Sequence, residues 1–231
     1  DSDIDAIMSR TRTRPIPAGR VAREEALMLG LTLSALSVVT MTLAGGLLAA
    51  ALLAFTIFFY AVVYTIWLKR LTPQNIVIGG LSGALPPAIA WAAKAGTLSL
   101  DPLLLVALIF MWTPPHFWAL ALMARKDYAA ARVPMLPVTD GAQSTRVHIF
   151  IYTLLLAPLG FAPVLTGLGG AVYGAVAALG GAFFVILAWR LLRSGAGDGD
   201  PAQNKPARDL FAFSILYLFA LFAALLAERG F

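Results

Sequence analysis

Residues 46–68 read GLLAAALLAFTIFFYAVVYTIWL, an apolar run without a charged side chain that ends directly before Lys69 and Arg70. A helix of roughly 20 apolar residues is long enough to cross the hydrocarbon core of a bilayer. Further runs of this kind lie on both sides of it, at about 24–44, 74–93, 102–124, 147–167, 170–192 and 209–228. The pattern predicts an all-α, polytopic membrane protein, a helical bundle with about seven transmembrane helices.

The composition supports this class. Hydrophobic residues make up 60% of the 231 residues and charged residues 13%, and a soluble domain carries about twice that charge. The absence of cysteine excludes disulfides and thiolate metal sites. No repeat and no second-domain signal separates the runs, so we expect one transmembrane domain over 1–231. A Gly-, Asp- and Pro-rich stretch at 194–208 is typical of a mobile linker.

The basic residues predict the orientation in the membrane. If the connections between runs alternate between the two sides, all 17 Lys and Arg residues except Lys94 and Arg229 lie on one side. That side is cytoplasmic by the positive-inside rule. It also holds every carboxylate except those of Asp101 and Glu228. We therefore expect the polar chemistry to face the cytoplasm, and we expect no binding to nucleic acid.

The N-terminal segment combines carboxylates with arginines. Asp1 and Asp5 are four residues apart, a spacing that places both on one face of a helix, where they could hold one hard cation. Guanidinium groups suit a polyphosphate because each presents a planar fork of donors. The segment supplies five of them, Arg10, Arg12, Arg14, Arg20 and Arg23. This combination indicates a metal-diphosphate site; the alternative is a solvated loop beside the membrane.

Two neighbouring runs contain proline pairs, Pro86-Pro87 and Pro114-Pro115. Each proline removes an amide donor and frees a carbonyl one turn earlier, so both pairs predict helix breaks that are buried in protein or line a cavity. The second pair lies in residues 112–118, which read WTPPHFW. An ionisable residue inside the membrane is by default a functional candidate, and His116 is such a residue. The alternative is that His116 only caps a freed carbonyl.

Several strings resemble the UbiA superfamily of intramembrane prenyltransferases. DSDID (1–5) is similar to the end of the superfamily's first aspartate motif, and RTRTRP (10–15) and YTIWLKR (64–70) match its pattern. TPQNIVIGG (72–80), WTPPHFW (112–118), Asp127-Tyr128 and PMLPV (134–138) resemble the branch that farnesylates heme. The superfamily has nine spans, so the resemblance implies that the first helix and most of the second are missing from this chain. The chain also begins without methionine, and we expect it to be a piece of a longer protein.

The resemblance implies a reaction and a set of site residues. Farnesyl diphosphate, heme B and water would give heme O and pyrophosphate, at the bacterial inner membrane, with Mg²⁺ as cofactor. Asp1, Asp5 and Asp127 would hold the metal and, with His116, form the catalytic group. The diphosphate would be bound by Arg10, Arg14, Tyr64, Lys69, Arg70 and Lys126. The resemblance also suggests membrane lipid and heme-copper oxidase assembly factors as partners.

The heme and prenyl pocket is expected at Asn75, Trp112, His116, Phe117 and Trp118. Aromatic walls would keep water from a farnesyl cation, although aromatic residues at such positions are more often simple packing. His116 would ligate the heme iron or steer the added water, and the sequence leaves both open. His148 is interpreted as structural.

One departure from the wider superfamily concerns the second acidic motif. That motif usually has two aspartates four apart, whereas here Asp127 is followed by Ala131. Lys126 or Tyr128 could take part of the diphosphate in place of the missing carboxylate. A prenyltransferase acting on an aromatic quinone precursor fits the motif and the WTPPHFW string less well. A transporter would also show broken helices, but it would not need carboxylates and arginines on one face only.

Overall fold

The computed structural model describes residues 1–229, and every regular element within them is a helix. The chain forms two compact units, one made of residues 1–98 and 126–135 and the other of residues 99–125 and 136–231. We call them unit 1 and unit 2 and describe each by itself. The predicted all-α class is confirmed, whereas the expectation of a single domain stays a prediction.

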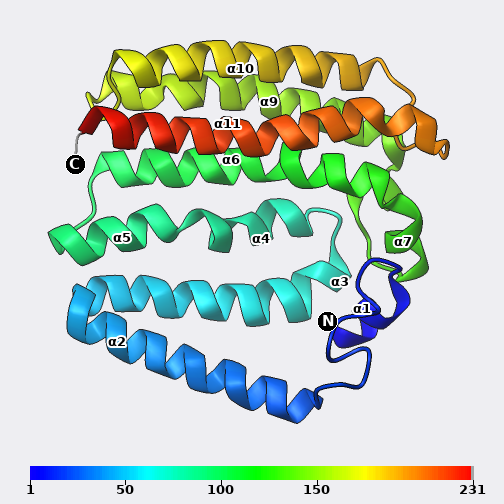
Figure 1. Ribbon diagram of the computed structural model, residues 1–231, viewed down its shortest axis with the longest axis horizontal. Helices are drawn as coiled ribbons and strands as arrows, with labels where there is room; N and C mark the ends of the chain where they lie inside the picture. Colours follow the sequence, from blue (N-terminus) through cyan, green and yellow to red (C-terminus); the bar gives the residue numbers. More distant parts are fainter. Residues whose placement is uncertain (230–231) are drawn as a thin grey trace. The chain divides into compact units, whose positions relative to one another are not determined.

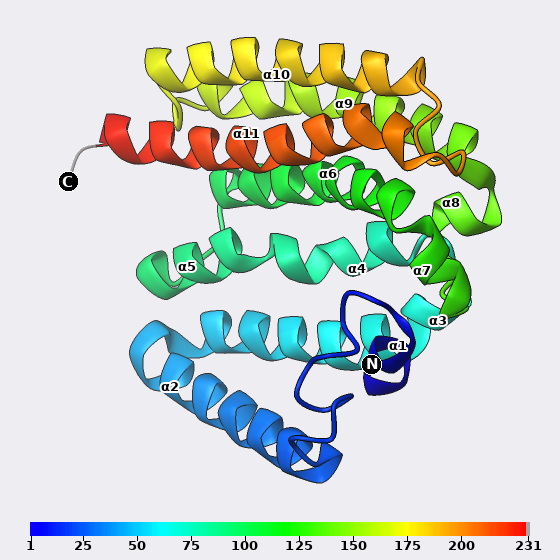
Figure 2. The same cartoon turned by 45° about the vertical axis from the view of Figure 1, so that its right-hand side comes forward.

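Unit 1 begins with a short helix and continues into long apolar ones (Figure 1). Its elements are α1 (Ser2–Ile7), α2 (Arg23–Phe58), the π-helix η1 (Phe59–Leu68), α3 (Lys69–Leu71), α4 (Asn75–Ala84), α5 (Pro86–Ala95) and α7 (Arg125–Ala130). Helix α2 is interrupted at Gly46, whose φ of 82° lies in the region that favours glycine. The chain reverses there, so two of the predicted apolar runs form an antiparallel pair (Figures 1 and 2).

Unit 2 is a bundle of four long helices with two short ones beside them. Its elements are α6 (Leu100–Met123), α8 (Leu136–Thr139), α9 (Gly141–Leu165), α10 (Ala171–Leu192), the 3₁₀ turn η2 (Pro201–Asn204) and α11 (Lys205–Arg229). Helix α6 packs on α9 and α11, and α10 packs on the same two helices. The largest fully buried side chains are the aromatic residues Trp118, Tyr173, Phe184 and Tyr217 together with leucines such as Leu108, so the bundle is held together by a mixed aromatic and aliphatic core.

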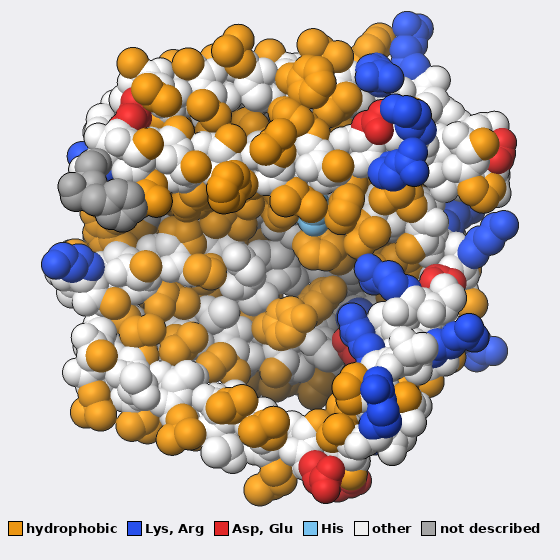
Figure 3. Space-filling model, in the orientation of Figure 1, with side chains coloured by type: hydrophobic (Ala, Val, Ile, Leu, Met, Phe, Trp, Pro, Cys, Tyr) orange, Lys and Arg blue, Asp and Glu red, His pale blue; other side chains and the backbone are white. Residues whose placement is uncertain are grey.

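Six stretches of the described residues are long and apolar enough to cross a membrane, and the first, Arg23–Leu71, spans 49 residues. It contains both runs that Gly46 separates, which accounts for the seven runs expected. In each unit, apolar side chains cover much of the visible surface and Lys and Arg gather mostly near one end (Figure 3). Leucines of α2 such as Leu43 and Leu47 are more than three-quarters exposed. Such a surface is stable in lipid rather than in water.

The two proline pairs have different outcomes. Helix α4 ends at Ala84 and α5 begins at Pro86, where prolines in a first turn cost no hydrogen bond. The break predicted there is confirmed. The break predicted at Pro114-Pro115 is wrong, because α6 continues through both residues. Residues 113–116 are buried, and packing by neighbouring helices lets a membrane helix keep its course through proline.

The stretch 194–208 was expected to be mobile, but polar contacts fix its first half. Arg146, which is 5% exposed, donates to the Ala196 carbonyl and to Asp198, the latter at 3.0 Å. Arg125 donates to the Gly197 carbonyl at 3.0 Å. Composition alone indicated a linker because these basic partners lie 50 to 72 residues earlier in the sequence.

Candidate functional site

Helix α1 presents three carboxylates to three different cations of unit 1. Asp1 pairs with Lys69, and Asp5 pairs with Arg14 at 2.9 Å. The Asp3 carboxylate accepts hydrogen bonds from both terminal nitrogens of Arg70, at 2.8 and 2.9 Å. This fork is the strongest geometry for a carboxylate and a guanidinium. The Arg70 hydrogen bonds hold the pKa of Asp3 well below its usual range, so the carboxylate is ionised at neutral pH.

The orientation of α1 follows from its apolar residues. Ile4 and Met8 are buried, at 4% and 3% exposure, and they fix the face that turns inward. The Thr11 hydroxyl donates to the carbonyl of Asp5 at 3.0 Å, which ties the following loop back to the helix. Asp1 and Asp3 therefore remain available for Lys69 and Arg70, which lie 68 and 67 residues later in the chain, respectively.

The second acidic motif reaches the same cluster through Ser9. The Ser9 hydroxyl donates to Asp127 at 2.6 Å. Burial raises the pKa of the neighbouring Tyr128 hydroxyl above the usual tyrosine value, and the charge of Arg10 acts in the opposite direction. Lys126 lies exposed on α7.

The π-helix η1 brings Tyr64 and Lys69 together along the chain. The Lys69 amide donates to the Tyr64 carbonyl, five residues earlier, and a π-helix repeats at this longer interval. The Tyr64 ring lies against Gly79 of α4, where a Cβ would overlap the ring carbons. The position of Tyr64 is thus fixed by its carbonyl, which accepts from the Lys69 amide, and by its ring, which lies against the Gly79 backbone.

A cavity of about 420 Å³ opens at this cluster, lined by Asp1, Asp5 and Arg14 among others. Two carboxylates one helical turn apart are a common protein contribution to a Mg²⁺ site, where substrate phosphates and water supply the remaining ligands. Within residues 1–229, however, no three His, Asp or Glu side chains are grouped to share one metal ion. Asp127 is not grouped with Asp1 and Asp5, and its carboxylate accepts a hydrogen bond from Ser9. Asp1 and Asp5 by themselves fit the metal.

His116 lies inside a group of aromatic rings in unit 2. Its ring stacks on Trp112 at 4.3 Å and on Phe211 at 4.5 Å between centroids, and Phe117 meets it edge-on at 5.1 Å. Its Nδ1 lies 2.7 Å from the Ser214 hydroxyl, and Trp112 Nε1 donates to the Ser214 carbonyl at 2.8 Å. The alternative that His116 caps a freed carbonyl is not what the structure shows, because its hydrogen-bond partner is a side chain of α11.

The remaining pocket residues differ in accessibility. Phe117 is 38% exposed, whereas Trp118 has no exposed surface and packs edge-on against His148 and Tyr152. Asn75 belongs to unit 1, is fully buried, and donates to the Thr72 carbonyl at 2.7 Å. His148 contacts the Ser144 carbonyl one turn earlier at 2.8 Å, as expected of a structural histidine.

Sequence reasoning gave no role to Asp3, Ser9, Phe211 and Ser214. The four-residue spacing in the first motif indicates a shared helix face for Asp1 and Asp5, whereas Asp3 is two residues from each and does not lie on that face. Ser9 carries no motif signal, and Phe211 and Ser214 lie about 100 residues from their partners in the chain. Only the fold could bring these four residues into the two groups.

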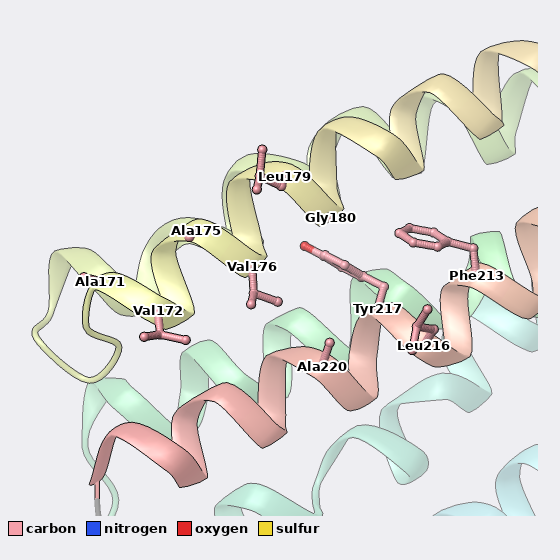
Figure 4. Close-up of a pocket in the computed structure, with 10 residues that line it drawn as sticks. All are labelled: Ala171, Val172, Ala175, Val176, Leu179, Gly180, Phe213, Leu216, Tyr217 and Ala220. Atoms are coloured by element: carbon pink, nitrogen blue, oxygen red, sulfur yellow. The ribbon is translucent and has the colours of Figure 1, made fainter.

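A further cavity, of about 640 Å³, lies between α10 and α11 of unit 2 (Figure 4). It is lined by small and apolar side chains, with Phe213 and Tyr217 the largest. It offers no ionisable group other than the Tyr217 hydroxyl, which is buried without a hydrogen-bond partner among the described residues. The cavity therefore has no means of binding a charged substrate.

Comparison with known proteins places these features in a family context. The UbiA prenyltransferase family matches residues 1–216. A protoheme IX farnesyltransferase of Hyphomonas neptunium is 62% identical over 232 residues, covering 100% of this chain and 73% of the relative. Relatives of the same name from Caulobacter vibrioides and Azorhizobium caulinodans are 60% and 61% identical, covering 99% of this chain and 74% and 73% of their own lengths. No solved structure matches the chain.

Proposed function

Because the chain belongs to the UbiA prenyltransferase family, we propose that the ion-pair cluster of unit 1 binds the diphosphate of its prenyl donor and that the His116 group of unit 2 binds its acceptor. The protein is an integral membrane prenyltransferase. It transfers the farnesyl group of farnesyl diphosphate, with addition of water, to a vinyl group of heme B, giving heme O and pyrophosphate.

The observation that carries the donor site is the pairing of Asp1 with Lys69 and of Asp5 with Arg14 at one cavity. A diphosphate entering this cavity brings anionic oxygens that compete for the same cations. Asp1 and Asp5 would then hold Mg²⁺, which when bound would neutralise charge on the leaving diphosphate. Lys69 and Arg14, released from their carboxylates, bind the phosphate oxygens as charge-assisted donors.

Further residues of unit 1 extend the diphosphate site. Arg70 follows Lys69 in the chain, and its two hydrogen bonds to Asp3 hold its guanidinium against helix α1. The charges of Arg10 and Asp127 both act on Tyr128, and in this proposal Tyr128 rather than a second aspartate supplements the second acidic motif. Lys126 and Tyr64 complete the set as outer donors. Together these groups stabilise the charge that develops when the allylic C–O bond breaks.

The acceptor site uses the apolar environment of His116. Trp112, Phe117 and Phe211 offer flat apolar faces suited to a porphyrin and to a farnesyl cation. Excluding water here until the vinyl group has attacked protects the cation from early hydrolysis. Trp118, which is fully buried, packs edge-on against His148 and Tyr152 of α9 and thereby anchors this part of α6. His116 provides the polar group of the site.

The location in the cell follows from charge. The proposed location of the diphosphate site is the cytoplasmic face of the bacterial inner membrane, and the basic residues of the connections support it. Farnesyl diphosphate is itself charged and reaches the site from water. Because heme O serves terminal oxidases, heme-copper oxidase assembly factors are the proposed partners for its release.

An assay with purified protein, farnesyl diphosphate, Mg²⁺ and heme B tests the proposal. The expected product is a heme heavier by one hydroxyfarnesyl group, detected by mass spectrometry, with release of pyrophosphate. Lys69→Ala should reduce kcat/KM for farnesyl diphosphate at least about tenfold, the effect of losing a hydrogen bond to a charged group. Lys205→Ala removes a lysine paired with Asp209 in unit 2 and should leave the rate unchanged. Equal rates for both variants would contradict the assignment of the donor site.

A further inference from the structure

The hydroxyl of Ser214 has only one hydrogen to give. It lies 2.6 Å from the carbonyl oxygen of Phe211 and 2.7 Å from Nδ1 of His116. Two oxygens at 2.6 Å need a hydrogen between them, and a carbonyl has none. The Ser214 hydrogen therefore points to Phe211, and the hydroxyl oxygen faces His116 with a lone pair.

This arrangement fixes the proton on the His116 ring. Because the Ser214 oxygen is an acceptor toward Nδ1, the contact of 2.7 Å requires Nδ1 to carry the hydrogen. In a neutral imidazole the other nitrogen, Nε2, then carries a lone pair. Nε2 makes no hydrogen bond to the part of the chain described. The fully buried side-chain atoms without a partner among these residues belong to Asn75, Trp118 and Tyr217, and Nε2 of His116 is not one of them. It therefore keeps some accessible surface although the residue is 8% exposed.

We propose that Ser214 is a positioning residue that holds His116 in the Nδ1-protonated tautomer, with Nε2 as a lone-pair donor toward the acceptor substrate. The inference rests on the proposed function of His116. It deepens that proposal, because Nε2 can ligate the heme iron or accept a hydrogen bond from the added water but cannot donate one. Histidine ligands in metal sites are commonly oriented by such a partner on the other ring nitrogen.

The neighbouring contacts keep the ring from rotating away from Ser214. Trp112 and Phe211 stack on its two faces, and Trp112 is itself tied to the Ser214 carbonyl. Phe211 and Ser214 are three residues apart on α11, and Trp112 and His116 are four apart on α6. Each pair therefore shares one helix face. The hydrogen bond and both stacking contacts thus come from one helix-helix contact within unit 2.

Nitrogen-15 NMR of the histidine-labelled protein tests the tautomer directly. The chain has two histidines, so two imidazoles are observed, and His116→Ala assigns them. We expect Nδ1 of His116 to be protonated and Nε2 to be bare in the ligand-free protein. We expect Ser214→Ala to produce a mixture of tautomers, and Ser144→Ala, beside His148, to leave the His116 signals unchanged. A protonated Nε2 in the unsubstituted protein would overturn the proposal.

Heme titration and turnover separate this inference from the function on which it rests. Ser214→Ala should weaken heme affinity by about 10- to 100-fold, typical of losing a partner behind a metal ligand, and shift the heme absorption spectrum, with KM for farnesyl diphosphate unchanged. Ser214→Thr, which keeps a hydroxyl, should restore both. If His116→Ala is impaired but Ser214→Ala behaves as wild type, the positioning role is wrong and the site stands. If His116→Ala binds heme and turns over normally, the proposed acceptor site itself is wrong.

Discussion

At the scale of single residues, the first acidic motif acts through three aspartates with separate partners. Asp1 and Asp5 line the cavity, whereas Asp3 fixes Arg70 through a two-nitrogen fork. Asp3 is 56% exposed at its side chain, so the pair contributes little to overall stability. Its effect is to set where the Arg70 guanidinium lies.

Replacing Asp5 tests the metal assignment. Asp5→Asn keeps the shape of the side chain but removes the charge that Mg²⁺ and Arg14 share. Turnover should fall about a hundredfold or more, the usual result of losing one group that stabilises transition-state charge. Raising Mg²⁺ should restore part of it. Asp209→Asn, which removes an ion-paired carboxylate in unit 2, serves as the control; near-normal turnover of Asp5→Asn at limiting Mg²⁺ would contradict the assignment.

Tyr128 provides a test that involves pH. Burial raises the pKa of its hydroxyl above the usual value of 10.0, so the group stays protonated and able to donate as pH rises toward that value. Tyr128→Phe should raise KM for farnesyl diphosphate about fivefold, the effect of one hydrogen bond of about 1 kcal/mol. The ratio of the two KM values should stay constant from about pH 6 to about pH 9. A ratio that falls steadily with rising pH would show that the hydroxyl ionises in this range.

At the scale of helices, the apolar runs predicted most of the fold because a membrane helix must satisfy its own backbone. The break at Pro86 followed from the same argument. The continuity of α6 through Pro114 and Pro115 could not be predicted, because it depends on packing by α9 and α11. The π-helix Phe59–Leu68 was also missed, since the run has the composition of an ordinary helix.

The candidate site was predictable where charge and spacing carry the signal. The resemblance assigned four residues to one site, and the structure pairs them as Asp1 with Lys69 and Asp5 with Arg14. The roles of Ser9 and Ser214 could not be predicted, because a serine has no distinguishing pattern and its partner is set by the fold. Asp127 accepts a hydrogen bond from Ser9, a contact that no motif indicated, and its role as a metal ligand stays a prediction.

Gly79 tests the packing between α4 and the π-helix. A Cβ at this position would overlap the Tyr64 ring, so Gly79→Ala must displace Tyr64 or the helix. Overpacking of this kind costs about 1–3 kcal/mol of stability, measured by thermal unfolding in detergent, and turnover should fall with it. Gly83→Ala, on the same helix with open space at its Cβ, should be close to wild type. Equal behaviour of the two variants would show that α4 adjusts freely.

At the scale of the whole molecule, the distribution of charge implies one orientation in the membrane. The chain lacks cysteine, so single introduced cysteines report their own side without a background. Ser194→Cys should react with a membrane-impermeant thiol reagent only from the cytoplasmic side, and Thr97→Cys only from the other. Labelling of both from one side would contradict the alternation on which the orientation depends.

The central claim is that two chemically different groups bind two different substrates: ionic residues of unit 1 bind the diphosphate, and the aromatic residues around His116 in unit 2 bind the heme. Equilibrium binding of farnesyl diphosphate and of heme B to Arg14→Ala and His116→Ala tests it most directly. Arg14→Ala should weaken farnesyl diphosphate binding about tenfold or more and leave heme binding nearly intact, and His116→Ala should do the reverse. Equal weakening of both substrates by each variant, in folded protein, would contradict the claim.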